Sequence, residues 1–244
     1  MDPEVAAQKR AVHLELIERM RLMRPEPRRV LKTDLFEEAF GEDQLLGEFP
    51  VQARLLCGVD VAAPTVARCQ TRFPALGGKL AAGDLRALPF REGSFDWIVS
   101  NSSLDHFETR EELEAACGEL CRLLTPGGVL LLTLDNPGNP LYHLLRFAAR
   151  RGWAPFPLGV TMEAAEVKAL LERQGLEVRE QDYFLYNPRG VSTLLFLLIR
   201  KVLGKRGKGV VGALLRGFAL LRKLPGWRWS ACFHVTWGMR PERN

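Results

Sequence analysis

The sequence of 244 residues predicts a single α/β domain built on a mostly parallel sheet with helices on both faces. Short apolar segments alternate with amphipathic helical segments, a pattern typical of strands that are buried on both faces. Hydrophobic residues make up 47% of the chain, enough for a substantial core. No internal repeat or low-complexity tract interrupts this pattern, so we expect one continuous domain.

The expected elements begin with an N-terminal helix over residues 3–24, which Pro25 and Pro27 end. A further helix is expected to open at Pro64, where a missing N–H is harmless, and Pro126-Gly127-Gly128 is expected to close another. Helices are thus predicted from Pro64, over 111–124 and over 162–174; strands are predicted at 29–31, 55–59, 80–82, 95–99, 129–134 and 176–186, with an antiparallel edge strand at 231–238. We therefore divide the domain into an N-terminal helix (1–27), a core (28–137) and an insertion (187–229).

The charge is distributed unevenly along the chain. The net charge is +5, yet residues 183–241 contain eleven Lys or Arg and no Asp or Glu, so the preceding part is net acidic. This asymmetry suggests an anionic partner for the C-terminal quarter. The five cysteines form no C-x-x-C pair and are interpreted as buried, reduced thiols, and no metal site is expected. The charged N-terminus has no apolar signal segment, so we expect a cytoplasmic protein.

The insertion combines apolar and basic segments. Residues 191–199 are nearly all apolar, a basic KRGK turn follows at 205–208, and residues 210–221 are again apolar. Neither apolar run approaches the roughly 20 residues that span a bilayer. The segment 191–223 is therefore either a lid or an element that lies on an anionic membrane surface, or an ordinary buried helix pair with a solvated loop. Nucleic acid is a less favoured partner, because apolar residues dominate.

Short polar side chains follow almost every predicted strand: Thr33 and Asp34, Asp60, Asp84, Ser100 and Asn101, Asp135 and Asn136. In an open α/β sheet, ligands bind beyond the carboxyl ends of the strands. A carboxylate at Asp60 can accept both hydroxyls of a ribose, or it can cap the next helix. Asp84 can accept from the amino group of an adenine, or it can be a turn residue after Gly83.

Five segments resemble the class I S-adenosylmethionine-dependent methyltransferases: Gly58-Val59-Asp60-Val61, Gly83-Asp84-Leu85, and the segments 94–101 (SFDWIVSN), 104–107 (LDHF) and 124–130 (LTPGGVL). The resemblance covers residues 28–137. It implies a Rossmann-like, seven-stranded, mostly parallel sheet whose last strand is antiparallel, and it implies S-adenosylmethionine as cofactor. Asp60, with Val61 beside it, would hold the ribose, Asp84 and Leu85 the adenine, and Asn101 and Ser102 the methionine end.

The loop after the first strand departs from this family. The family has an acidic residue followed by alternating glycines, which let the backbone approach the cofactor. Here the run Lys32–Gly41 (KTDLFEEAFG) contains one glycine. Three explanations are open: Thr33 and Asp34 contact the methionine moiety through their side chains, the cofactor site is degenerate, or the first strand lies elsewhere.

The resemblance implies methyl transfer, and the apolar insertion suggests a hydrophobic small molecule or lipid as acceptor, with O-, N- or C-methylation left open. His106 is the first candidate for a general base, with Asp105 beside it, and His143 is the second. The alternative function is a catalytically degenerate domain that binds a membrane surface or a protein. In either case the protein is expected to be cytoplasmic, with the inner face of the membrane as its place of attachment if the insertion binds lipid.

Overall fold

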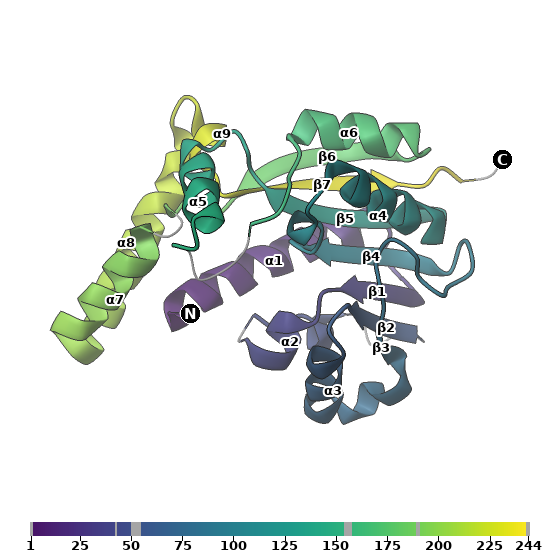
Figure 1. Ribbon diagram of the computed structural model, residues 1–244, viewed down its shortest axis with the longest axis horizontal. Helices are drawn as coiled ribbons and strands as arrows, with labels where there is room; N and C mark the ends of the chain where they lie inside the picture. The colour runs from purple at the N-terminus through teal and green to yellow at the C-terminus, as the bar shows by residue number, and fades with distance from the viewer. Residues whose placement is uncertain (1, 42, 50–54, 154–157, 189–190, 243–244) are drawn as a thin grey trace.

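A computed structural model describes residues 2–41, 43–49, 55–153, 158–188 and 191–242. It contains one seven-stranded sheet in the order β3-β2-β1-β4-β5-β7-β6 (Figure 1). The strands are β1 (Arg29–Thr33), β2 (Leu55–Asp60), β3 (Leu80–Ala82), β4 (Phe95–Asn101), β5 (Leu124–Asp135), β6 (Glu177–Phe184) and β7 (Phe233–Met239). Pairing is parallel from β3 through β5, and β7 is antiparallel to both of its neighbours, as predicted.

The predicted position of β7 at the edge of the sheet is wrong, because β7 lies between β5 and β6. Its residues are almost all buried, and its polar side chains find partners inside: His234 contacts the carbonyl of Met162, and Thr236 accepts from Gln181. The edge strand is β6, whose exposed positions carry charges such as Glu177 and Glu180. Charged side chains along a sheet edge oppose pairing with other chains, which is the physical signature of an edge.

Helices cover both faces of the sheet (Figure 1), as predicted. One face packs against α1 (Pro3–Met23), α2 (Phe36–Phe40) and α3 (Ala63–Arg72), and the other against α4 (Arg110–Leu123) and α6 (Ala164–Arg173). Strand alternation divides β4 between the two cores, since Trp97 and Val99 join the first and Ile98 joins the second. Burial on both faces is what makes the central strands near-continuous hydrophobic runs.

The turn at 126–128 belongs to β5 and does not close a helix, because α4 already ends at Leu123. Gly127 has φ of +70°, and its N–H donates to the carbonyl of Arg240 beyond β7. A left-handed backbone at this point favours glycine. The segment therefore bends into the sheet and extends β5 to twelve residues.

The remaining helices lie together at one end of the sheet, on the left of Figure 1. They are α5 (Pro140–Arg150), α7 (Val191–Leu203), α8 (Gly207–Ala219) and α9 (Trp227–Ser230), with a 3₁₀ turn at Leu220–Lys223. Phe196, Val211 and Leu215 form a small separate core with Val5 of α1. No helix of the described segments is both long and apolar enough to cross a bilayer.

Candidate functional site

Side chains from two neighbouring strand ends act on the carboxyl group of Asp34 at the carboxyl edge of the sheet. Asp34 follows β1, Asp60 ends β2, and His106 lies in a 3₁₀ turn after β4. Burial raises the pKa of the Asp34 carboxyl, against the opposing charge of Lys32, and the charges of Asp60 and His106 act on it in opposite directions. The structure thus brings together three of the side chains that the sequence singled out.

Asp34 occupies the backbone conformation that a glycine normally supplies. Its φ is +61°, in the left-handed region that costs a non-glycine residue free energy. Its Oδ1 accepts the N–H of Phe36 at 2.8 Å, which fixes the carboxylate against its own loop. A strained residue with a desolvated carboxylate is a feature that clusters at ligand sites.

The loop between β1 and α2 keeps its backbone donors for itself. The N–H of Asp34 donates to the carbonyl of Val59 at 2.9 Å, that of Leu35 to Oδ2 of Asp60 at 2.9 Å, and that of Phe36 to Asp34. A glycine-rich loop would present such donors to an anionic ligand. In this chain a ligand at the loop meets carboxylate oxygens instead, so the loop suits a cation or a hydroxyl donor.

A buried ion pair beneath the loop holds it in this shape. The ammonium of Lys32 donates to the carbonyls of Thr33 and Asp34 and lies 3.6 Å from Oε1 of Glu38. The Glu38 carboxylate accepts the N–H groups of Leu45 and, more weakly, of the next residue. Sequence reasoning missed this pair, although a lysine inside a central strand requires an acidic partner and Glu38 is close in the chain.

Asp60 is shared between the loop and the helix that follows β2. Its Oδ2 accepts from Leu35, and its Oδ1 accepts from the N–H of Ala62 at 2.8 Å. The N-cap of α3 is Ala62, so Asp60 forms a turn before the helix and is not its cap. Each carboxylate oxygen can accept more than one hydrogen bond, and each accepts one from the backbone here, so capacity is left for ligand hydroxyls. Val61 is exposed directly beside it.

The end of β4 supplies an unpaired acceptor. Asn101 Oδ1 is buried and has no hydrogen-bond partner among the described residues. Ser102 has φ of +46°, and its N–H donates to the side chain and the carbonyl of Thr133. A buried amide oxygen without a donor costs free energy, which a ligand donor would remove. Asn101 is therefore a candidate ligand contact.

Thr33 and Asp84 are engaged in contacts within the protein. The buried Thr33 hydroxyl contacts the hydroxyls of Ser100 and Ser103, at 3.0 and 2.7 Å, and so joins β1 to β4. The Asp84 carboxylate is bound by the guanidinium and the N–H of Arg86, which lowers its pKa. Asp84 is thus a turn residue after Gly83, which is one of the two roles expected from the sequence. A contact with adenine would have to use lone pairs of its carboxylate that Arg86 does not occupy. Leu85 packs against the core under α4.

The residues predicted to take part in catalysis do not all lie together. Asp105 is buried in the 3₁₀ turn Leu104–His106, and the next side chain, His106, is exposed. His143 is exposed on α5 and stacks edge-on with Tyr142; no contact among the described residues joins it to His106. His106 is therefore the histidine at the strand ends. The described side chains contain no cluster of three or more metal-binding residues.

Part of the chain is similar in sequence to known methyltransferases. A family model described as a methyltransferase domain matches residues 38–132. A malonyl-[acyl-carrier protein] O-methyltransferase of Methylococcus capsulatus is 34% identical over 147 residues, covering 60% of this chain and 50% of the relative. An uncharacterized methyltransferase of Mycobacterium tuberculosis is 31% identical, covering 45% and 55%. The chain thus spans about half the length of these curated relatives.

Solved structures agree on the fold. A SAM-dependent methyltransferase from Archaeoglobus fulgidus has a TM-score of 0.61 at 14% identity, over 95% of this chain and 94% of that one. Haemonchus contortus phosphoethanolamine N-methyltransferase 2, bound to phosphomonomethylethanolamine and S-adenosylhomocysteine, has a TM-score of 0.60 at 14% identity, over 93% and 53%. The overall fold is thus similar to that of these proteins.

Proposed function

We propose that the chain is a class I methyltransferase that transfers a methyl group from S-adenosylmethionine to a hydrophobic acceptor. A methyltransferase-domain model matches residues 38–132, and the fold is similar to that of a SAM-dependent methyltransferase. The observation that carries this proposal is the group of acceptor atoms at the strand ends. Asp34, Asp60 and Asn101 present carboxylate and amide oxygens from three adjacent strands.

These oxygens are complementary to the cationic and hydrogen-bond-donor groups of the cofactor. Its cationic groups are an ammonium and a sulfonium, and its ribose carries two hydroxyls. Asp34 is the proposed partner of the ammonium, since its side chain is half-buried at the strand ends and the N–H groups of residues 34–36 are already bonded within the protein. Asp60 and Val61 are the proposed ribose contacts, and the unpaired Asn101 oxygen, beside Ser102, is a proposed contact for the methionine end. Asp84 and Leu85 remain the proposed adenine contacts.

The bound cofactor supplies an electrophilic methyl group, so the protein mainly positions and desolvates the acceptor. We propose His106 as the base that takes the proton of an acceptor O–H or N–H, because it is exposed at the same strand ends. Asp105 would then position the turn that carries it. His143, on α5, is a proposed contact at the acceptor side.

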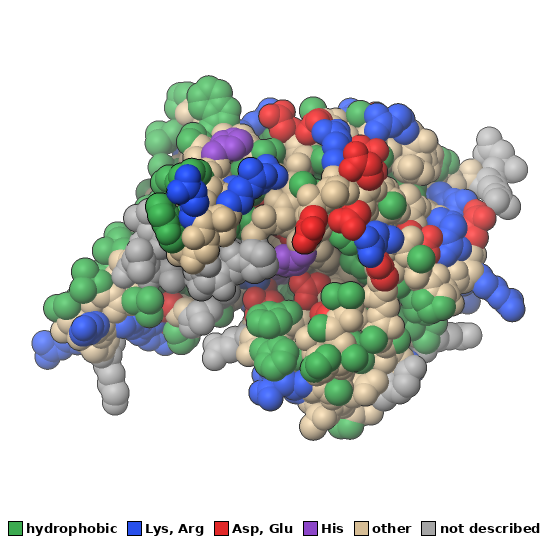
Figure 2. All heavy atoms as spheres, in the orientation of Figure 1, with side chains coloured by type: hydrophobic (Ala, Val, Ile, Leu, Met, Phe, Trp, Pro, Cys, Tyr) green, Lys and Arg blue, Asp and Glu red, His purple; other side chains and the backbone are tan. Residues whose placement is uncertain are grey.

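Similarity to an O-methyltransferase that acts on malonyl-[acyl-carrier protein] supports an acceptor with an acyl or lipid character. The exposed apolar residues of the insertion support the same class of acceptor. Figure 2 shows hydrophobic side chains gathered on the part of the surface that α5, α7, α8 and α9 form, with Lys and Arg among them.

Titration calorimetry with S-adenosylmethionine and S-adenosylhomocysteine tests the proposed function. The expected result is saturable binding of both with one site per chain. Absence of binding by either at millimolar concentration overturns it and leaves the alternative of a degenerate domain. NAD and ATP serve as comparison ligands, and tighter binding of one of these would assign the site to another adenine nucleotide.

We further propose that the insertion docks on an anionic membrane surface. Several of its apolar side chains are largely exposed, including Leu197 (61%), Val202 (71%) and Trp229 (70%). Arg200 is paired with Asp2, the N-cap of α1, but Lys201 and several other cations have no carboxylate within ion-pair distance among the described residues. Apolar side chains flanked by unpaired cations favour the interface of an acidic bilayer.

Flotation with vesicles of phosphatidylcholine and phosphatidylglycerol tests this docking. Binding is expected to decrease at high salt, since screening weakens charge attraction. The variant Lys201→Glu is expected to weaken binding, whereas Lys168→Glu, which changes the charge equally at an exposed position on α6, is the matched control. Equal binding to pure phosphatidylcholine vesicles, or equal effects of both variants, would contradict an anionic docking surface.

A further inference from the structure

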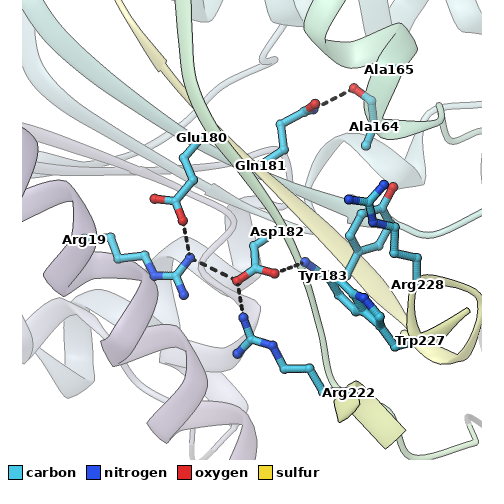
Figure 3. Close-up of a pocket in the computed structure, with 10 residues that line it drawn as sticks. All are labelled: Arg19, Ala164, Ala165, Glu180, Gln181, Asp182, Tyr183, Arg222, Trp227 and Arg228. Atoms are coloured by element: carbon cyan, nitrogen blue, oxygen red, sulfur yellow. Dashed lines mark hydrogen bonds and ion pairs between the residues drawn. The ribbon is translucent and has the colours of Figure 1, made fainter. Parts of the chain in front are cut away.

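Arginine side chains hold two aspartates on opposite edges of the sheet, in different surroundings. Asp182 of β6 lines a cavity of about 400 Å³, where Arg19 of α1 and Arg222 of the 220–223 turn contact its Oδ2 at 3.0 and 2.9 Å (Figure 3). This carboxylate is 13% exposed and joins three elements, so its role is structural. Asp84 follows β3 at the other edge of the sheet, and its side chain is 40% exposed.

The side chain of Arg86 engages both oxygens of the Asp84 carboxylate. Its Nε lies 3.0 Å from each oxygen, and its Nη2 donates to Oδ2 at 2.6 Å. The backbone N–H of Arg86 donates to Oδ1 at 2.9 Å. A carboxylate has about four lone-pair positions. Three N–H groups of one residue therefore take up most of the acceptor capacity that Asp84 could offer to a ligand.

Arg86 has further partners that do not involve Asp84. Its Nη1 donates to Oε1 of Glu112, and its guanidinium carbon lies 5.7 Å from the centre of the Phe107 ring. Glu112 is itself held at the N-terminus of α4, where its Oε2 accepts the N–H of Thr109 at 3.3 Å in a capping box. Arg86 can therefore release Asp84 and keep an ionic partner and an aromatic contact. Exposed ion pairs of this kind contribute little to stability, so the release is accessible.

We propose that Arg86 determines the base specificity of the cofactor site, because it competes with the 6-amino group of adenine for the Asp84 carboxylate. This inference rests on the proposed function, in which Asp84 is an adenine contact. A guanidinium bound to Asp84 occupies the acceptor and neutralises its charge, and charge-assisted hydrogen bonds are the stronger ones. A free carboxylate accepts from an amino group and repels the carbonyl oxygen of a 6-oxopurine. Arg86 thus weakens the selection of adenine over such a base.

Calorimetry with S-adenosylhomocysteine and S-inosylhomocysteine tests this competition. The two ligands differ only in the base, since the second has a 6-oxo group and a proton on N1. The base preference is the affinity for the first ligand divided by that for the second. Arg86→Ala frees the Asp84 carboxylate and should raise this preference about tenfold, as expected for one hydrogen bond to a charged acceptor. Arg86→Met, which keeps an unbranched side chain beside Phe107 but has no donor, should act in the same direction.

The matched control is Arg110→Ala, which removes an exposed arginine at the same end of α4. Arg110 pairs with Glu114 and Glu166, so its loss should change the base preference less than about twofold. The double variant Arg86→Ala/Asp84→Ala should return the preference to its wild-type value, because the gain requires the carboxylate.

An unchanged base preference in Arg86→Ala, or an equal change in Arg110→Ala, would overturn the competition. Binding of S-adenosylhomocysteine in the same titrations would still support the proposed function. Absence of S-adenosylhomocysteine binding to both wild type and Arg86→Ala overturns the two proposals together. Arg86 is exposed, so an unchanged thermal midpoint of the variant checks that the fold is retained.

Discussion

Oδ2 of Asp60 accepts a hydrogen bond from the backbone N–H of Leu35 at 2.9 Å. This bond ties the end of β2 to the loop after β1, the place where the sequence departs most from the family that it resembles. It also turns the loop donor inward, which leaves side-chain oxygens as the proposed ligand contacts at this edge of the sheet. We therefore propose that the glycine-poor loop contacts a ligand through Asp34 and Asp60.

Replacing Asp60 with Ala should weaken S-adenosylhomocysteine binding and loosen the loop together. The substitution removes the proposed ribose acceptor and leaves the Leu35 N–H without a partner. We expect an affinity loss of about ten- to a hundredfold, from one or two charge-assisted hydrogen bonds. Calorimetry measures the affinity, and hydrogen exchange at Leu35 measures the loop. Faster exchange with unchanged affinity would remove Asp60 from the binding site and leave it a structural role.

Replacing Asp34 with Gly should stabilise the free protein while it weakens cofactor binding. Glycine adopts φ of +61° without strain, and the variant also removes a desolvated carboxylate. We expect a gain of about 1 kcal/mol in the free energy of unfolding. Asp34→Ala keeps the strained backbone, so the difference between the two variants in chemical denaturation isolates the backbone contribution. A glycine variant less stable than the alanine variant would contradict the strain.

Asp96 should be essential for stability, although it lies away from the proposed ligand site at the strand ends. Asp96 is buried at the start of β4, and its carboxylate accepts hydrogen bonds from the backbone N–H groups of Arg28 and Arg29. The guanidinium group of Arg24, the residue that follows α1, forms an ion pair with the same carboxylate at 3.1 Å. Burial acts to raise its pKa, but these hydrogen bonds and charges lower it overall. Asp96→Ala leaves buried donors unpaired and should cost about 3 kcal/mol in urea denaturation.

The control for Asp96 is Glu18→Ala, since Glu18 is an exposed partner of Arg21 on α1. A surface pair contributes less than about 1 kcal/mol. Equal unfolding free energies of the two variants would show that the Asp96 network does not anchor β1 and β4.

His234 should make the protein sensitive to acid. Its Nε2 contacts the Met162 carbonyl at 2.9 Å, and its buried Nδ1 has no partner among the described residues. Burial lowers the pKa of His234 from 6.5 to about 4, so the unfolded chain binds the proton more readily between these values. The contribution to stability is complete above pH 6.5 and is lost as pH falls toward 4, by roughly 3 kcal/mol. Denaturation midpoints against pH should flatten in His234→Gln, and an unchanged slope would contradict this role.

The sequence predicted the central sheet because strands buried on both faces leave short apolar runs. It also predicted that Asp34, Asp60 and Asn101 lie at one edge, since the carboxyl ends of parallel strands meet there. The order of β6 and β7 was reversed, because the alternation in β7 comes from internally bonded His234 and Thr236. Helix α5 was missed, although Asn139 and Pro140 are the N-cap and first residue that begin a helix.

The shape of the loop could not be predicted, because it depends on contacts among residues that sequence patterns treat separately. Lys32 has the position of a strand residue, yet its ammonium reaches the loop carbonyls and Glu38. The pairing of Arg86 with Asp84 is likewise a matter of side-chain geometry. Such contacts decide which candidate oxygens have free acceptor capacity.

The most direct test of the account compares S-adenosylhomocysteine with 5′-methylthioadenosine, which lacks the amino-acid portion, in wild type and in Asp34→Asn. If the Asp34 carboxylate binds the ligand ammonium, removal of the amino-acid portion should cost wild type about tenfold or more in affinity. The same removal should cost Asp34→Asn little. An equal loss in both proteins, or no binding of S-adenosylhomocysteine to wild type, would contradict recognition by this side chain.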